Sequence, residues 1–421
     1  MAYAATMSKH ENAKLDLATL RAIPSGIWAL GVVALLMDIS SEMIHALLPI
    51  YLVTVMGVSV LTVGIIEGIA EATAAIVKIF SGAISDKLGK RKMLAVIGYG
   101  LAAFTKPVFP LAGAVGWVVA ARFIDRIGKG IRGAPRDALM ADISPEHLRG
   151  ASFGLRQSLD TIGAFVGPLL AILLMWLFAN NITAVFWFAV IPAFLAMFFM
   201  IFGVQEPDRP PGLRKVKSPF SREELKRLGS RGYWSVVAVA VVFTLARFSE
   251  AFLLLKAQST GLPIMLVPAV MVVMNLVYAL AAYPAGVLSD TGGRVRVLVV
   301  GLSVLVIADL VLAFSTGVIG VMIGVALWGL HMGLTQGLLT TMIADEAPAE
   351  LRGTAFGMYN LLTGLALLAA SIIAGALWEW VGPKATFLAG AAFTAVSLIG
   401  FIVLARRPAN QYTAENSKPQ P

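Results

Sequence analysis

Ionisable side chains recur at helical spacing inside long apolar stretches of this sequence. Asp38, Glu42 and His45 follow one another at intervals of four and three residues, which places them on one face of a helix. Such groups are costly in an apolar environment unless they are paired or hydrated, so they mark where chemistry is expected. The remaining members of the candidate substrate and proton site are Glu67, Glu71, Arg122, Asp125, Arg126, Asp160, Arg247 and Glu250.

Carboxylates beside arginines can exchange a proton for another ligand. A carboxylate holds a proton weakly beside a cation and more tightly once that pair breaks in a dry environment. We expect Asp38 or Glu42 to release a proton on the cytoplasmic side of a membrane and to be reprotonated from outside. In between, the carboxylate binds a cationic substrate or pairs with Arg122 or Arg126. Fixed ion pairs between helices are the alternative, and a lone histidine such as His45 is more often a hydrogen-bonded wall residue.

The composition requires a membrane to surround these groups. Of the 421 residues, 58% are hydrophobic and only 14% are charged, which is more apolar surface than a soluble core hides. Stretches of roughly 20 apolar residues or more predict twelve transmembrane helices, so the fold class is an all-α membrane protein. The predicted helices are 25–55, 60–84, 93–112, 115–141, 151–178, 184–204, 233–256, 263–288, 297–314, 317–343, 354–378 and 384–405.

The helices fall into two sets of six around a polar connection. We expect an N-terminal segment over 1–24, a six-helix bundle over 25–204, a basic linker over 205–232, a second bundle over 233–405 and a tail over 406–421. No cleaved signal peptide is expected in the first segment, and the end of the linker, SREELKRL, predicts a short surface helix.

Basic residues in the short loops predict the orientation. They gather in alternate loops, around Lys90, Arg149, Arg294 and Arg352, while the other loops are nearly free of them. The positive-inside rule then places both termini and the linker in the cytoplasm, and we expect a prokaryotic inner membrane. The net charge of +9 is explained by topology, so no nucleic-acid partner is expected.

Two sequence segments recur across the halves. Asp86 in SGAISDKLGKRK corresponds to Asp290 in AGVLSDTGGRVR, 204 residues later, and Asp142 in ADISPEHLRG corresponds to Asp345 in ADEAPAELRG, 203 residues later. A weaker echo aligns Ser41-Glu42 with Ser249-Glu250. Because six helices separate the copies, both halves have the same orientation and are related by an axis along the membrane normal, as in transporters whose halves rock about a central site.

These motifs resemble those of the major facilitator superfamily over nearly the whole chain. Gly82, Asp86, Gly89 and Arg91 resemble the family's loop motif GxxxDxxGRR, and the segment from Arg122 to Gly130 resembles its helix 4 motif RxxQGxG. The string DRIGKGIRGAPRDALMAD is most similar to a prokaryotic subgroup of efflux permeases that includes nickel-resistance proteins.

A third motif concerns helix–helix contact and coupling. Gly163, Gly167 and Pro168 are similar to the GxxxGP motif of proton-coupled exporters. The two glycines are expected to let their helix approach a neighbour closely, and Pro168 is expected to bend it.

The resemblance implies a secondary transporter that works by alternating access. It implies a monomer with a small-molecule or ion substrate, protons as the coupling ion and no cofactor or resident metal. We expect a gating network that joins the loop motif (Gly82, Asp86, Gly89, Arg91) and the GxxxGP motif (Gly163, Gly167, Pro168) to Arg136, Asp142 and Asp290.

The leading functional hypothesis is proton-coupled efflux of a small cationic or metal-related solute. The alternative is proton-coupled import of an anionic solute, such as an organic acid or a metal chelate, suggested by the cations of the fourth predicted helix. A non-transporting receptor or scaffold explains neither the matched halves nor the buried charges. An enzyme is not expected, because the sequence lacks nucleotide-binding, zinc-protease and serine-hydrolase motifs. The absence of cysteine excludes disulfides and thiolate metal sites.

Overall fold

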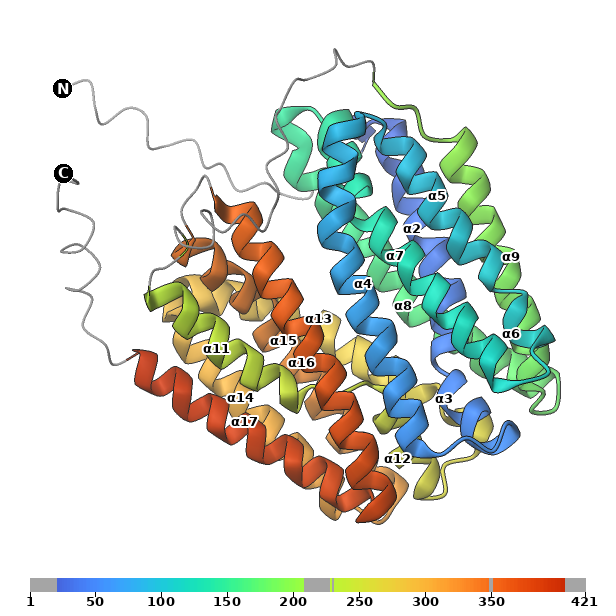
Figure 1. The fold of residues 1–421 in the computed structure, drawn as a ribbon, viewed down its shortest axis with the longest axis vertical. Coiled ribbons are helices and arrows are strands. Elements are labelled where there is room, and N and C mark those ends of the chain that lie inside the picture. Colours follow the sequence, from blue (N-terminus) through green and yellow to red (C-terminus); the bar gives the residue numbers. More distant parts are fainter. Residues whose placement is uncertain (1–20, 208–227, 229–230, 348–350, 406–421) are drawn as a thin grey trace.

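The computed structural model describes residues 21–207, 228, 231–347 and 351–405. Throughout these residues the regular structure is helical, and the helices form two bundles that lie side by side (Figure 1). The all-α fold with two six-helix halves is therefore confirmed. The predicted helix SREELKRL and both terminal segments fall almost entirely outside the described residues.

The first bundle contains the helices before the linker. Its elements are α2 (Ser25–His45), α3 (Leu48–Ile50), a π-helical turn (Tyr51–Val55), α4 (Val60–Leu88), α5 (Arg91–Thr105), α6 (Val108–Leu111), α7 (Val115–Ile143), α8 (Arg149–Leu177) and α9 (Ile182–Phe202).

The second bundle repeats this arrangement with a different distribution of breaks. Its elements are α11 (Arg231–Ala246), α12 (Ala251–Ser259), α13 (Ala269–Gly292), α14 (Arg294–Phe314), α15 (Val318–Glu346), α16 (Arg352–Trp380) and α17 (Pro383–Ala405).

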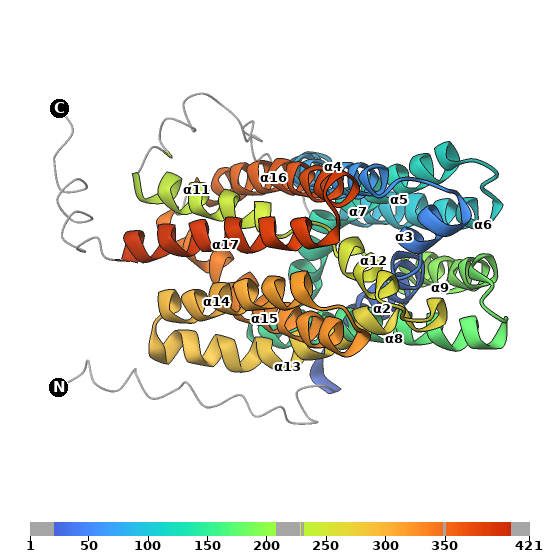
Figure 2. The same cartoon turned by 90° about the horizontal axis from the view of Figure 1, so that it is seen from below.

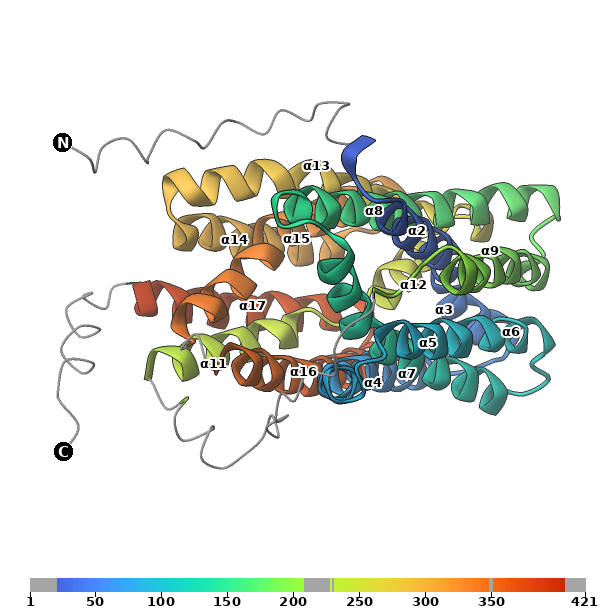
Figure 3. The same ribbon diagram turned by 90° about the horizontal axis from the view of Figure 1, so that it is seen from above.

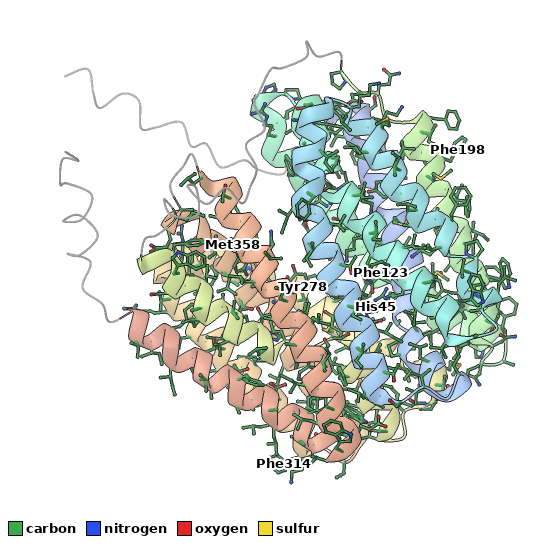
Figure 4. All side chains as sticks on the ribbon, viewed as in Figure 1. His45, Phe123, Phe198, Tyr278, Phe314 and Met358 are labelled. Carbon is green, nitrogen blue, oxygen red and sulfur yellow. The ribbon has the colours of Figure 1, made fainter. Side chains whose placement is uncertain are left out.

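Most of these helices are apolar enough to cross a bilayer. Within the described residues, eleven helical segments have the length and hydropathy of a membrane span. The remaining predicted span is α7, which is 29 residues long but carries a series of charged side chains. Large apolar side chains such as Phe198 and Phe314 are more than half exposed on the outside of the bundles (Figure 4), where lipid would cover them.

Two of the predicted spans are interrupted at corresponding places. The first span breaks after His45, where Pro49 lies in the first turn of α3 and a π-helical turn follows. The seventh breaks between Ala246 and Ala251, and Ser249 Oγ accepts a hydrogen bond from the backbone N–H of Ala251 at 3.2 Å. Interrupted helices of this kind expose backbone polar groups, which is tolerated at membrane depth where they line a polar cavity.

The buried apolar residues divide into three clusters. One cluster joins both halves and includes Leu47 and Phe186 of the first bundle with Phe252 and Leu254 of the second. Two smaller clusters each belong to one half, around Tyr99 and around Tyr233. The shared core lies at the end with α3 and α12, called the far end here. The separate cores lie at the opposite end, where α9 finishes and α11 begins, called the linker end.

Two pairs of helices form the contact between the bundles. Helix α4 runs along α16 and helix α8 runs beside α13, as the views from below (Figure 2) and above (Figure 3) both show. Glycines make the first contact close: a Cβ added at Gly68 would lie 3.0–3.2 Å from Leu368, and one added at Gly375 would lie 2.9 Å from Leu61 Cα. Gly64 packs even more tightly on the backbone carbonyl of Ser371.

The GxxxGP motif forms a second close contact, inside the first bundle. A Cβ added at Gly163 would lie 2.8 Å from the carbonyl oxygen of Leu35, and one at Gly167 would lie 2.8 Å from that of Ile39. The expectation that these glycines allow close helix approach is confirmed, and the neighbour is α2. Because this contact includes the Cβ atoms of Asp38 and Glu42, the motif fixes how α2 presents its carboxylates.

The α4–α16 contact predicts a variant that opens the far end. Gly64→Leu places a side chain against the Ser371 backbone, and overpacking of this kind costs about 1–3 kcal/mol. We expect the far end to separate, so that a cysteine at Ala370, which is 2% exposed, reacts about tenfold faster with a small maleimide. The chain has no native cysteine to interfere. Gly116→Leu, at a glycine with open space around it, is the control and leaves the rate unchanged. Equal rates in the two variants would show that the contact does not close the far end.

Candidate functional site

A cavity of about 710 Å³ lies between the two bundles. Helices α2, α4, α7 and α8 form one wall, and the break between α11 and α12 together with α13, α15 and α16 forms the other. His45 and Tyr278 lie on either side of this central region in Figure 4. Nine of the predicted site residues line the cavity: Asp38, Glu42, His45, Glu71, Asp125, Arg126, Asp160, Arg247 and Glu250.

The other two predicted residues, Glu67 and Arg122, lie behind the wall as a buried ion pair. Arg122 Nη2 donates to Glu67 Oε2 at 2.7 Å, and both side chains are nearly inaccessible, at 3% and 1% exposure. The expected pairing of Arg122 with Asp38 or Glu42 is therefore wrong. Helix α4 packs directly against α7, so a carboxylate of α4, not one of α2, reaches this arginine.

His45 connects this buried pair to the cavity. Its Nδ1 lies 3.6 Å from Glu42 Oε2, and its Nε2 lies 3.7 Å from Glu67 Oε2. Glu42 faces the cavity and Glu67 does not. The imidazole thus stands between an accessible and an inaccessible carboxylate, which is an arrangement that can pass a proton between them.

A second ionic cluster lies farther along α7. Arg126 Nη1 is 3.3 Å from Glu71 Oε1, and its Nε is 3.9 Å from Asp125 Oδ2. Lys106 Nζ, at the junction of α5 and α6, contacts Asp125 Oδ1 at 3.0 Å and Ser41 Oγ at 3.1 Å. Sequence analysis did not identify Lys106, although a single lysine within the apolar run GLAAFTKPVF is a signal for a buried partner.

Several charges of both signs line the cavity without an ionic partner. In the described part of the chain, Asp38 and Glu250 lie beyond ion-pair distance of any basic group. Four cations likewise have no carboxylate at ion-pair distance among the described residues: Lys78, Lys129, Arg132 and Arg247. Arg132 instead lies over the Tyr99 ring at 4.8 Å, and Arg247 lies 5.7 Å from the Phe243 ring centre.

Neutral hydrogen-bonding and aromatic side chains dominate the wall of the second bundle. Asn275, Trp328, Tyr359 and Asn360 line the cavity there, beside the break that carries Arg247 and Glu250. The amide of Asn275 also donates to the carbonyl of Ala164 in α8 at 3.1 Å. The two walls therefore differ: ions dominate the first, and neutral polar groups dominate the second.

Ion pairs and hydrogen bonds surround the loop motif at the linker end. Arg91 forms an ion pair with Asp142 and donates to the carbonyl of Ala138 at 3.0 Å. Glu206 accepts hydrogen bonds from the backbone N–H groups of Arg91 and Lys92, at 2.6 and 3.2 Å, which caps α5. Gly89 ends α4 with a φ of 63°, a conformation that favours glycine.

Two further ion pairs lie within the first bundle, one at Arg136 of the predicted gating set and one at Asp160 of the predicted substrate site. Arg136 pairs with Asp137 at 3.1 Å, and Asp160 pairs with Arg156 one turn away. The side chains of Asp86 and Asp290 lie outside the described residues. A Cβ added at Gly82 would lie 3.4 Å from the Cβ of Ala134, so the loop motif lies against α7.

Metal-binding side chains are scattered. Within the described residues there is no group of three or more histidine, cysteine, aspartate or glutamate side chains arranged to hold a metal ion.

Comparison with known proteins gives this architecture a family. The sequence model of the Major Facilitator Superfamily matches the chain over residues 30–276 and 251–421. The chain belongs to the major facilitator superfamily. It is therefore a multi-pass membrane transporter of a small-molecule substrate and not an enzyme.

Relatives agree with this assignment. The chain is 32% identical over 385 residues to an uncharacterised transporter of this superfamily from Methanocaldococcus jannaschii, over 90% of this chain and 94% of the relative. It is 24% identical to the staphylopine export protein of Staphylococcus aureus, over 79% of this chain and 84% of that protein. The solved nucleoside transporter NupG shares the fold, with a TM-score of 0.75, 12% identity and coverage of 90% of this chain and 99% of that one. The resemblance to nickel-resistance permeases stays a prediction.

The buried Glu67–Arg122 pair predicts that removing one partner lowers the stability of the folded protein. Removing one partner of a buried ion pair leaves an uncompensated charge and costs about 3–5 kcal/mol. Glu67→Gln is expected to lower the thermal unfolding midpoint of the purified protein clearly, and adding Arg122→Gln to it is expected to recover most of the loss. Glu379→Gln, at an exposed glutamate on α16, is the control. A Glu67→Gln protein as stable as the parent would contradict the pairing.

Proposed function

We propose that this transporter is a proton-coupled antiporter that exports a small polar solute carrying both anionic and cationic groups. The observation that supports this most directly is the presence, in one cavity, of unmatched cations on α4 and α7 and unmatched carboxylates on α2 and at the α11–α12 break. A solute with charges of both signs satisfies both sets when it enters.

This substrate class refines the hypothesis of a purely cationic or metal-related solute. A simple cation could pair with Asp38 or Glu250, but it would leave Lys78 and Lys129 unmatched and would be repelled by them. An anionic group placed between Lys78, Lys129 and Arg132 is favoured by charge, and the cationic end of the solute then faces Glu250 across the cavity. A chelated metal meets the same requirement, whereas a bare metal ion does not.

Protons are proposed to act at the Glu42–His45–Glu67 series. Glu42 is accessible from the cavity, and His45 links it to the buried Glu67–Arg122 pair. Binding of a proton at Glu42 or His45 changes the net charge facing the solute and so changes the affinity for it. Competition between proton and solute for one charged site produces exchange.

Export is favoured over import by two observations. The Gly163–Pro168 motif resembles that of proton-coupled exporters, and a relative of this chain is named for the export of staphylopine. The basic loops further support a cytoplasmic linker end, in a bacterial inner membrane with both termini cytoplasmic. The cavity of the present conformation then faces the cytoplasm, where an exporter collects its solute.

Import of an anionic solute remains the second candidate. The unmatched cations are more numerous than the unmatched carboxylates, and this excess favours an anion. Transport in right-side-out and inverted vesicles under an imposed pH gradient separates the two directions. The solute itself is found by testing a deletion strain against amino-acid conjugates, organic acids, drugs and metal chelates.

The proton hypothesis predicts an uncoupled variant. Glu42→Gln keeps the size of the side chain but cannot ionise. With the solute identified by the deletion strain, we expect the variant to retain exchange of labelled for unlabelled solute in proteoliposomes while uptake driven by a pH gradient falls about tenfold or more. Glu379→Gln, outside the cavity, serves as control. If pH-driven uptake by Glu42→Gln matches the parent, Glu42 is not the coupling group.

The proposed binding of an anionic group between Lys78, Lys129 and Arg132 predicts that removing one of these cations weakens solute binding. Lys129→Gln removes a cation that is exposed to the cavity, and hydrogen bonds to charged groups contribute about 1.5–3 kcal/mol. The KM for the solute should therefore rise about tenfold or more. The matched control is Lys384→Gln, because Lys384 lies over the Phe314 ring on the outer surface. Equal KM values for the two variants would remove Lys129 from the site.

A further inference from the structure

One ionisable group lies in the second bundle, apart from the ionic clusters described above. Asp309, in α14, is fully buried, and within the described structure neither of its carboxyl oxygens has a hydrogen-bond partner. It also has no basic group at ion-pair distance among the described residues. A carboxylate ion in such a place carries a large desolvation cost with nothing to offset it.

The carboxyl group occupies a notch made by a glycine. A Cβ added at Gly390 of α17 would lie 2.7 Å from Asp309 Oδ2 and 3.1 Å from the ring of Phe248. No side chain larger than hydrogen fits at position 390 without displacing the acid. Gly390 therefore leaves a space that fits the carboxyl group of Asp309. A core packed only with apolar side chains would not need such a space.

Phe248 borders both this notch and the cavity, and Trp328 packs against its ring. Phe248 and Trp328 both line the cavity, and their ring centres are 5.3 Å apart. Phe248 belongs to the break between α11 and α12, where it follows Arg247 and precedes Glu250 by two residues in the sequence. A movement of this break would shift Phe248 and with it one wall of the notch that holds Asp309.

The surroundings of α14 hold few groups that titrate. Helices α13, α15 and α17 pack against it. Their described titratable or charged side chains, with those of the nearby break, are Tyr278, Tyr283, His331, Glu346, Lys384, Arg247 and Glu250. His331 is itself fully buried and contacts Trp328 at 5.3 Å between ring centres, with no hydrogen-bond partner for either ring nitrogen in the described residues.

We propose that Asp309 is a proton-binding site of the second bundle, occupied in the present conformation and emptied when the Phe248–Trp328 wall opens. In the closed notch the group is a neutral carboxylic acid. When the break moves and water enters, the O–H bond of the acid breaks, the proton passes to cavity water, and the carboxylate is hydrated. The site lies outside the Glu42–His45–Glu67 series and does not depend on the solute or on the direction of transport.

The proposal has a direct spectroscopic test that needs no substrate. In infrared spectra of the purified full-length protein at neutral pH, a protonated carboxyl in apolar surroundings gives a carbonyl stretch well separated from ionised carboxylates. We expect this band in the parent and its loss in Asp309→Asn, which has the shape of the protonated acid. Asp160→Asn, at an aspartate paired with Arg156, should keep the band. Absence of the band in the parent, or an Asp309→Asn spectrum in which none of the band is lost, overturns the proposal.

A second measurement tests the link to conformation. Because ionisation of Asp309 requires the open wall, raising the pH should favour opening and increase the maleimide reaction rate of a cysteine at Ala370, beyond the intrinsic pH dependence of the thiol. We expect this extra increase to be reduced at least several-fold in Asp309→Asn. An unchanged increase would mean that Asp309 is a permanently neutral core residue. Both measurements can fail while proton-coupled export by the cavity residues still holds, and the reverse is also true.

Discussion

Charges that are shut away from water in the first bundle must be compensated there, and this constraint organises the transporter. The Glu67–Arg122 pair holds α4 against α7 with both side chains buried. Helix α4 also packs through glycines on α16 of the other half. The same helix thus carries the ionic cross-link within one bundle and the main contact between bundles, which gives the ionic pairs of α7 a direct structural connection to the contact between the halves.

The two halves preserve a common backbone plan while their chemistry differs. The break after His45 and the break before Ala251 fall in corresponding spans. Glu42 lies in α2 just before the first break, whereas Glu250 lies within the second. In the first half the region around the break is joined to ion pairs. In the second it faces tyrosine, asparagine and tryptophan. Under the proposed function, a solute held between them would meet mainly charged side chains on the first wall. On the second wall it would meet Glu250 together with hydrogen-bonding and aromatic side chains.

The sequence was sufficient for the architecture because lipid imposes a strict length and composition on each span. Even α7 was predicted despite its many charges, since its apolar positions still extend across a bilayer. The partners of those charges were not predictable. Arg122 was expected to meet Asp38 or Glu42 but meets Glu67, because pairing depends on which helices cross, and helix crossing has no signal in a single sequence. Lys106 and Glu206 were missed for a related reason: each is a lone charge near a helix end, and only the packed structure shows its partner.

The unmatched charges also set a condition for movement. For the cavity to close at the linker end, water must leave Lys78 and Lys129, and desolvating an unpaired ion costs several kcal/mol. An anionic group on a bound solute removes much of that cost, as a proton does for an unpaired carboxylate such as Asp38. The empty, unprotonated cavity is then the form least able to close. Under the proposed function, a carrier that crosses only with one ligand or the other bound would exchange them, and electrostatics would suppress a leak of either.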